Sequence, residues 1–566
     1  MLSRIRLTGE EADPTNDTIP LMNTQDPGYA FARIGNTLEG IASRKRTVFL
    51  AVIVTVQFCL IMNSSWKATP DSALYLALGE SLARGEGYVF NGEPHTFVPP
   101  GLPLMLGAVA RVFSPDFAYY RILMAIFGLL AAALGYLFVA RLCGRDTALM
   151  VGGLVAVNHA LVENSTLILA DVPFAFFTFA ALNSALAAVR SPNRALWLVL
   201  SGLLMGILPV IRINGAATPI ATAIFLLYSW NDVALPRRIR FVVVFLCLAF
   251  LPALAWQYWT ASLPVSVSEG TYLHAVAGRT WGDQLHVIVN AFLGYFPELT
   301  SALTGISFKV VLLELPIPIL IAVGLYQALV KGERLLTTLT IIHFCGLLLS
   351  TAGTRYVIFL LPGLYLFFAL GLLSFTDALG RRTQRSLNAR KILIGVFALF
   401  ALLNAGHNVI TIVHARTALE KNGPEDDRTL PFFIASRWLK ANAPEATVLT
   451  SRSRIIHYLS GCRTISLVRS GVPEHQIWLN TQEEVQSLVK QTKPQFLYAD
   501  TKDSRYYSHV IESIKAMGVR LEEIPEASSK RYRLFRMLDL SAGWMGISPL
   551  VFCSMENSCK DLRKTP

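Results

Sequence analysis

Long apolar segments, separated by loops that contain arginine and lysine, recur along most of this chain. About 20 consecutive apolar residues are enough for a helix to cross the hydrocarbon core of a bilayer. Only 16% of the 566 residues are charged, whereas a soluble globular protein averages about 25%. The segments that reach or approach spanning length are Thr47–Asn63, Ala118–Ala140, Ala148–Leu161, Val172–Val189, Ala195–Ile211, Ala216–Tyr228, Phe241–Trp259, Val311–Val330, Leu335–Ser350, Tyr356–Phe375 and Ile392–Ile410. The sequence therefore predicts a polytopic α-helical membrane protein with about 11 transmembrane helices.

The basic residues are concentrated in every second loop. Lys+Arg number 50 against 38 Asp+Glu, a formal net charge of +12, which in a soluble protein would raise the question of nucleic-acid binding. Here they lie between apolar segments, for example at 44–46, 237–240 and 381–391. The positive-inside rule makes such loops cytoplasmic. We expect a multi-pass protein of the cell (inner or plasma) membrane, with a cytoplasmic N-terminus, an extracytoplasmic C-terminal region and no nucleic-acid partner.

Composition divides the chain into four parts. The first part is polar and lacks an apolar stretch, so it is expected to be a disordered cytoplasmic tail rather than a signal peptide. The second holds all the apolar segments, and the third has the composition of a soluble domain. The parts are the tail 1–46, the transmembrane domain 47–412 with its first outside loop at 64–117, an extracytoplasmic domain 413–540, and a C-terminal tail 541–566. In the last part, Cys553 and Cys559 could form a disulfide in an oxidising compartment or remain free.

The third part alternates between helical and strand patterns, which predicts a small α/β domain. Neither a GxGxxG motif nor a P-loop occurs in it, so nucleotide binding is not supported. The expected helices are 432–441, 455–459, 482–491 and 506–517, and the expected strands are 446–450, 464–468, 495–499, 520–523 and 531–536. Between the spans, Ser262–Phe308 is expected to be a long outside loop.

The first outside loop contains an acidic residue at the start of an expected helix. Leu74, Leu78 and Leu82 recur at four-residue spacing, which predicts one apolar face of a helix lying on the membrane surface. Asp71 precedes them, after Pro70. Two interpretations remain open: Asp71 is only the N-cap of that helix, or it is a carboxylate that takes a proton from a hydroxyl.

A second acid and three arginines are expected on the same outer face. Asp171 lies at the outer mouth of the fourth span, where an ionisable group is costly and either caps the helix or serves function. Arg121, Arg212 and Arg355 also lie at outer ends of spans. Each arginine alone could simply reach towards lipid headgroups. Together, two carboxylates and three arginines suit an anionic ligand, such as a lipid phosphate that arginine binds in a fork.

The motifs of this first loop resemble those of a known enzyme family. They are Pro70-Asp71-Ser72-x-x-Tyr75, the Gly-x-Gly-Tyr turn at Gly85–Tyr88, and Phe97-x-Pro99-Pro100-Gly101. In this order they resemble the lipid-carrier-dependent glycosyltransferases of the GT-C fold, which include the bacterial aminoarabinose transferases of lipid A and the protein O-mannosyltransferases. The resemblance implies a membrane enzyme that transfers a sugar from a polyprenyl-phosphate donor to a lipid, glycan or protein acceptor on the extracytoplasmic side.

The resemblance also implies roles for individual residues. Asp71 matches the catalytic base that gives inversion at the sugar carbon, and Asp171 matches an acid that holds the acceptor or a divalent metal, so both are also candidate metal ligands. The residues expected to bind substrate are Tyr75, Arg121, Arg212, Arg355 and Tyr356, with Arg355 and Tyr356 near the carrier phosphate. At Val98-Pro99 this chain departs from the Glu-Lys pair of the aminoarabinose transferases, which favours a generic hexose or pentose donor.

The alternative from another class is a transporter or flippase of lipid-linked sugars. Secondary transporters commonly show internal repeats and polar groups near the bilayer midplane. No self-similar halves are visible in this sequence, and its charged residues gather at the outer mouths of the spans. The sequence therefore favours a glycosyltransferase over a transporter.

Overall fold

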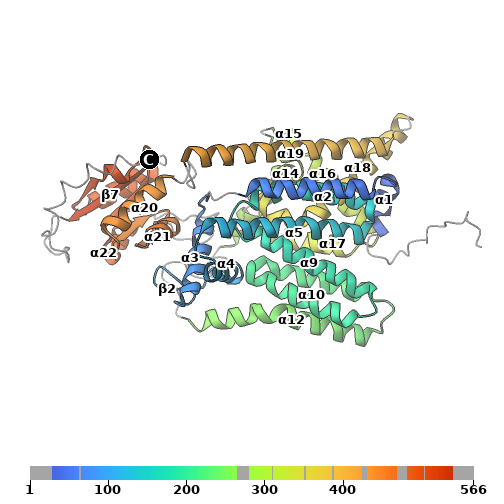
Figure 1. Cartoon of the computed structure of the whole chain (residues 1–566), viewed down its shortest axis with the longest axis horizontal. Helices are drawn as coiled ribbons and strands as arrows, with labels where there is room; N and C mark the ends of the chain where they lie inside the picture. Colours follow the sequence, from blue (N-terminus) through green and yellow to red (C-terminus); the bar gives the residue numbers. More distant parts are fainter. Residues whose placement is uncertain are drawn as a thin grey trace, which may run out of the picture.

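A computed structural model shows an elongated helical bundle with a small sheet-containing domain at one end (Figure 1). It describes residues 29–62, 66–263, 280–308, 310–349, 352–384, 388–422, 430–467, 481–501 and 504–539. The helices α3 and α4 of the first outside loop lie at the junction between the bundle and the sheet domain (Figure 1). The two expected parts are therefore both present, and the first loop lies where they meet.

The bundle consists of apolar helices that coincide with the predicted spans. Its main members are α2 (Arg44–Ile61), α5 (Phe117–Cys143), α9 (Asp171–Arg190), α10 (Arg194–Ile211), α11 (Ala217–Ser229), α12 (Leu235–Ala261), α16 (Pro316–Val330), α17 (Leu335–Leu347), α18 (Leu361–Thr383) and α19 (Ala389–Asn422). Among the described residues, 7 helices are long and apolar enough to cross a membrane: Phe117–Cys143, Asp171–Arg190, Arg194–Ile211, Leu235–Ala261, Leu312–Val330, Thr354–Thr383 and Ala389–Thr417. The polytopic helical fold is confirmed, and the number eleven stays a prediction.

Small residues let the central helices approach closely, as is usual between membrane helices. On α16, a Cβ at Gly324 would overlap the carbonyl oxygen of Phe367 on α18, and a Cβ at Gly371 would overlap the carbonyl oxygen of Leu320. Glycine is therefore required at both positions. The 3-10 turn η4 (Thr354–Leu360) leads directly into helix α18. Together they form the most buried of the candidate spans, and residues 354–356 lie at the start of this segment.

The third predicted span is broken rather than continuous. It consists of α6 (Arg145–Thr147), the π-helical turn η2 (Ala148–Gly152), α7 (Gly153–Val157) and α8 (His159–Asn164). The break occurs at Asn158, which is extended and whose side chain accepts a hydrogen bond from the backbone N–H of Leu161. Asparagine is a strong N-cap, so it ends one helix and begins the next.

Two other expectations were wrong. Part of the expected loop Ser262–Phe308 is helix α14 (Trp281–Thr304), which begins at a capping box formed by Thr280 and Asp283. The sequence did not predict this helix because His286, Asn290 and Pro297 interrupt its apolar pattern. Within the expected disordered tail, residues 29–46 are ordered as η1 (Tyr29–Phe31), α1 (Ala32–Leu38) and the start of α2. The reason is that Phe31, Ile34 and Leu38 are fully buried at helical spacing. The rest of that tail, 1–28, lies outside the described residues.

The first outside loop folds into α3 (Pro70–Arg84), the hairpin strands β1 (Val89–Phe90) and β2 (Glu93–Pro94), and α4 (Gly101–Val112). Leu74 and Leu78 of α3 are fully buried against Tyr88, Phe90 and Val98. The predicted apolar face is thus confirmed, but it packs on the hairpin of its own loop rather than on lipid.

The C-terminal domain has the predicted alternation of helices and strands. Its elements are α20 (Leu430–Asn442), β3 (Thr447–Thr450), α21 (Ser453–Ser460), β4 (Arg463–Ser466), α22 (Gln482–Thr492), β5 (Phe496–Asp500), α23 (Ser504–Lys515), β6 (Val519–Glu523), η6 (Pro525–Ala527) and β7 (Tyr532–Asp539). The strand order is β4-β3-β5-β7-β6. Strands β4, β3 and β5 are parallel, whereas β7 pairs antiparallel with both β5 and β6.

Helix α19 extends to Asn422, past the expected domain boundary at 412. Cys553, Cys559 and the tail 541–566 lie outside the described residues.

Candidate functional site

Asp71 lies in the first turn of α3, but it does not cap that helix. The N-cap is Thr69, whose hydroxyl accepts a hydrogen bond from the backbone N–H of Ser72 (3.1 Å). The capping interpretation of Asp71 is therefore wrong. Its carboxylate instead accepts from two arginines, Nη2 of Arg355 on Oδ2 (3.5 Å) and Nη1 of Arg454 on Oδ1 (3.3 Å).

Asp171 is the first residue of α9, and its side chain makes no capping hydrogen bond. Its side chain is 3% exposed and forms an ion pair with Arg212, which follows the last residue of α10. A carboxylate removed from water at this depth needs such a partner, because an unpaired buried charge is strongly destabilising. The alternative that Asp171 caps its helix is therefore wrong as well.

Tyr356 joins these two ion pairs. The guanidinium of Arg212 lies 4.9 Å from the centroid of its ring, and that of Arg355 lies 4.8 Å from the same centroid. Arg355 also donates from Nη2 to the Tyr356 hydroxyl (2.8 Å). A tyrosine ring attracts a guanidinium through its quadrupole, so Tyr356 keeps two arginines close together despite their like charge.

Tyr75 lies one helical turn after Asp71 on α3, within range of the charges of Asp71, Asp171, Arg212 and Arg355. Burial, followed by the negative charge of Asp71, raises the pKa of its hydroxyl well above the usual value. The hydroxyl of Tyr75 therefore stays protonated at neutral pH and is a hydrogen-bond donor beside the carboxylates.

The structure thus brings together six of the seven residues that the sequence singled out. They are Asp71, Tyr75, Asp171, Arg212, Arg355 and Tyr356. The seventh, Arg121, is buried near the start of α5 and donates from Nη2 to the carbonyl of Ile61 at the end of α2 (3.3 Å). This contact ties α5 to α2, and substrate binding by Arg121 stays a prediction.

Arg454 is the member of the cluster that sequence reasoning missed. It comes from α21 of the C-terminal domain, just after β3. The signal in the sequence was its place directly after the predicted strand 446–450. In the structure this strand is β3, which lies between two parallel strands, and functional residues tend to follow the carboxyl ends of parallel strands. With Arg454 included, three arginines face two aspartates, which leaves one net positive charge for an anionic ligand.

A metal site does not fit this arrangement. Asp71 and Asp171 are each paired with arginine. In the part of the chain that the structure describes, no group of three or more His, Cys, Asp and Glu side chains could hold a metal ion. Two carboxylates with adjacent guanidinium groups are a poor set of ligands for a hard cation, so no step below is assigned to a metal.

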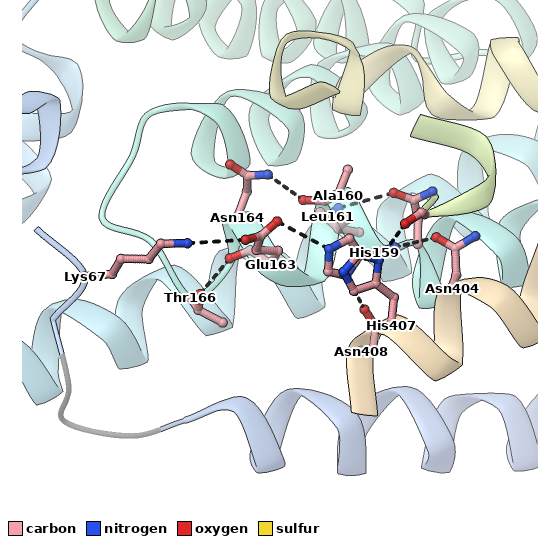
Figure 2. Close-up of polar contacts among 12 residues, drawn as sticks. Lys67, His159, Ala160, Leu161, Glu163, Asn164, Thr166, Asn404, His407 and Asn408 are labelled. Carbon is pink, nitrogen blue, oxygen red and sulfur yellow. Dashed lines mark hydrogen bonds and ion pairs between the residues drawn. The ribbon is translucent and has the colours of Figure 1, made fainter. Parts of the chain in front are cut away.

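A second polar cluster connects the first loop to the bundle (Figure 2). Glu163 of α8 pairs with Lys67 (3.4 Å) and with Nε2 of His159 (3.3 Å). The His159 ring stacks on that of His407 in α19, with centroids 3.6 Å apart, and its Nδ1 lies 3.0 Å from Oδ1 of Asn408. This network binds the break in the third span to α19 and to the segment that leads into α3.

The charge of Glu163 is expected to stabilise the fold in a pH-dependent way. Its carboxylate pairs with Lys67 and with His159, and only the charged carboxylate can form these pairs. Protonation of Glu163 in acid ends them, so the contribution is expected at pH 7 and is lost as the pH falls. The side chain is 37% exposed, so we expect Glu163→Gln to cost on the order of 1 kcal/mol at pH 7.

Thermal unfolding in detergent at pH 7 and pH 3 measures this effect. The wild type should unfold at a higher temperature than Glu163→Gln at pH 7, and the difference should shrink at pH 3. Glu526→Gln, at an exposed position of the C-terminal domain, is the control and should match the wild type at both values. A difference that stays constant with pH would contradict the assignment.

Comparisons with known proteins agree with this fold. Residues 97–256, less than half of the chain, match the family model of dolichyl-phosphate-mannose-protein mannosyltransferases. The crystal structure of ArnT from Cupriavidus metallidurans in the apo state is similar with a TM-score of 0.54 at 13% identity, over 86% of this chain and 97% of that one. The structure of the same protein bound to undecaprenyl phosphate has a TM-score of 0.50 at 13% identity, over 90% of this chain and 100% of that one. The crystal structure of the oligosaccharyltransferase of Archaeoglobus fulgidus in the apo form has a TM-score of 0.53 at 13% identity, over 88% of this chain and 74% of that one.

The chain has the GT-C fold. A search of curated protein sequences gives no match. The resemblance inferred from the sequence is confirmed, and the family-model match together with the fold indicates a multi-pass membrane glycosyltransferase.

Proposed function

We propose that this protein transfers a sugar from a polyprenyl-phosphate carrier to a hydroxyl group of a lipid, glycan or protein acceptor, on the extracytoplasmic face of the cell membrane. The observation that carries the proposal is the junction of two aspartates and three arginines around Tyr356, at the end of the bundle that meets the first loop. A similar structure supports the donor class, since ArnT was crystallised with undecaprenyl phosphate.

In the proposed reaction, the acceptor hydroxyl attacks the anomeric carbon of the sugar. Asp71 takes the proton of that hydroxyl as general base, while the bond between the anomeric carbon and the phosphate oxygen breaks. The leaving polyprenyl phosphate keeps both electrons of that bond and carries the negative charge away. Attack from the face opposite to the phosphate inverts the anomeric carbon, and no covalent intermediate with the enzyme is needed.

The arginines have a separate role in this proposal. Guanidinium groups bind phosphate through paired N–H donors, and Arg212 and Arg355 are held side by side against Tyr356. We assign them to the carrier phosphate, where they stabilise the charge that develops on the leaving group. Asp171 forms an ion pair with Arg212, so in this scheme it acts mainly by neutralising and positioning that arginine.

Transfer of radiolabelled sugar tests the proposal. Purified wild-type protein in detergent or proteoliposomes is incubated with membrane extract and polyprenyl-phosphate donors carrying hexoses or pentoses. Label should move from the donor into an acceptor fraction, whose chemistry identifies the acceptor class. If vesicles accumulate or flip the donor without forming a labelled product, the glycosyltransferase proposal is wrong and transport replaces it.

A further inference from the structure

The C-terminal domain contacts the first outside loop directly through α21, which packs on α3. Two side chains of α21 reach carboxylates of α3. Arg454 donates to Asp71 (3.3 Å), and the Tyr458 hydroxyl donates to Oε1 of Glu80 (2.8 Å). Burial raises the pKa of Glu80. The domain thus meets α3 at both the candidate base and a second acid two turns further along the helix.

The hairpin of the first loop holds the same domain at a second place. The Asn91 side chain donates to the Thr464 carbonyl (2.8 Å) and accepts from the Thr464 backbone N–H (3.0 Å). The backbone N–H of Asn91 donates to Nε2 of His457 (3.3 Å), whose ring packs edge-on against Phe90. A paired side-chain and backbone contact of this kind fixes register as well as distance, so α21 is held in one orientation over α3.

Aromatic packing fills the space between these two polar contacts. Trp66, which is 2% exposed, stacks on Phe117 and meets Tyr458 and Phe433 edge-on. Two of these rings belong to the C-terminal domain and two to the membrane domain. The domains therefore share one apolar core at this point, and the position of α21 is set by close packing.

Arg454 occupies a defined place in this interface. Its side chain is 15% exposed, and its guanidinium carbon lies 5.9 Å from the centroid of the Phe97 ring. Arg355 binds one oxygen of the Asp71 carboxylate and Arg454 binds the other. The orientation of the carboxylate is consequently determined by two arginines from two different domains.

We propose that Arg454 is a positioning residue of the transfer site, through which the C-terminal α/β domain orients the Asp71 carboxylate. This inference rests on the proposed function, because it assigns Arg454 a role in setting the base of that reaction. The docked C-terminal domain is then a part of the transfer site.

The kinetic test compares Arg454→Gln with wild type in the transfer assay. We expect Arg454→Gln to lower kcat by about 10-fold to 100-fold, with the KM for the donor changed by less than about twofold, because positioning acts through Asp71 and not on the carrier. Arg454→Lys retains the charge and an N–H donor and should restore most of the lost kcat.

Two further variants separate this role from a structural one. Tyr458→Phe removes the contact with Glu80 but leaves Arg454 in place, so it should lower stability without lowering kcat. Arg463→Gln removes one charge from an exposed position of the same domain and should behave as wild type. If Arg454→Gln proves too unstable to purify, initial rates are measured in isolated membranes and normalised to the amount of folded protein, and a normalised rate equal to that of the wild type would overturn the proposal.

The outcomes distinguish the two proposals. A wild-type kcat in Arg454→Gln would overturn the positioning role while sugar transfer itself stands. A wild type that transports the donor without transferring sugar would overturn the proposed function and this inference with it.

Discussion

Asp71→Asn is expected to lower sugar transfer by about 10²-fold to 10⁴-fold, the range of a general base. The amide is nearly isosteric with the carboxylate, but its single oxygen can accept from only one of Arg355 and Arg454, which contact different oxygens of Asp71. It has no basic oxygen that can take the proton of the acceptor hydroxyl. The measurement is the initial rate of label transfer from donor to acceptor by wild type and variant.

Glu86→Gln is the matched control for this experiment. Glu86 is an exposed acid of the same loop whose carboxylate pairs with Arg84 (2.7 Å), so its loss should leave transfer unchanged. The thermal stability of Asp71→Asn should fall only modestly, because the two ion pairs that are weakened share a carboxylate that is 33% exposed. A folded Asp71→Asn protein with more than about one tenth of the wild-type rate would remove Asp71 as the base.

Asp171→Asn is expected to have the second large effect, on both stability and transfer. The carboxylate is 3% exposed and Arg212 is 22% exposed, so neutralising Asp171 leaves a largely buried arginine without its counter-charge. Breaking a buried pair costs about 3–5 kcal/mol, and the partial exposure of Arg212 places the expectation near the lower end. The midpoint of thermal unfolding in detergent should fall, and transfer should fall with it because Arg212 is no longer held.

Asp232→Asn provides the comparison within the same chain. Asp232 pairs with Arg194 at 2.5 Å, but its side chain is 61% exposed, and an exposed pair contributes only about 0–1 kcal/mol. The double variant Asp171→Asn with Arg212→Gln should recover part of the stability, since the unpaired charge is removed as well. Equal losses in Asp171→Asn and Asp232→Asn would show that burial of the Asp171 pair does not stabilise the fold.

Regular structure and fold class followed from local patterns. Apolar segments of spanning length appear as helices because a membrane span must satisfy its own backbone hydrogen bonds. The alternation in residues 430–538 predicted the elements of the C-terminal domain in order, because each short amphipathic stretch has only one face to bury. Helix α14 was missed because polar residues and Pro297 interrupt its apolar pattern, and helix α1 because its buried face is short.

The sequence by itself determined that this is a polytopic membrane protein with an α/β domain. It also singled out Asp71 in the first loop, and Asp171, Arg212 and Arg355 at the ends of spans, as ionisable groups. Only the tertiary structure decided which of them are partners. Asp71 lies 284 positions from Arg355 and 383 positions from Arg454. The physical reason is that charge attraction carries no information about sequence distance. Packing of α21 on α3 and of η4 at the end of the bundle sets which guanidinium reaches which carboxylate.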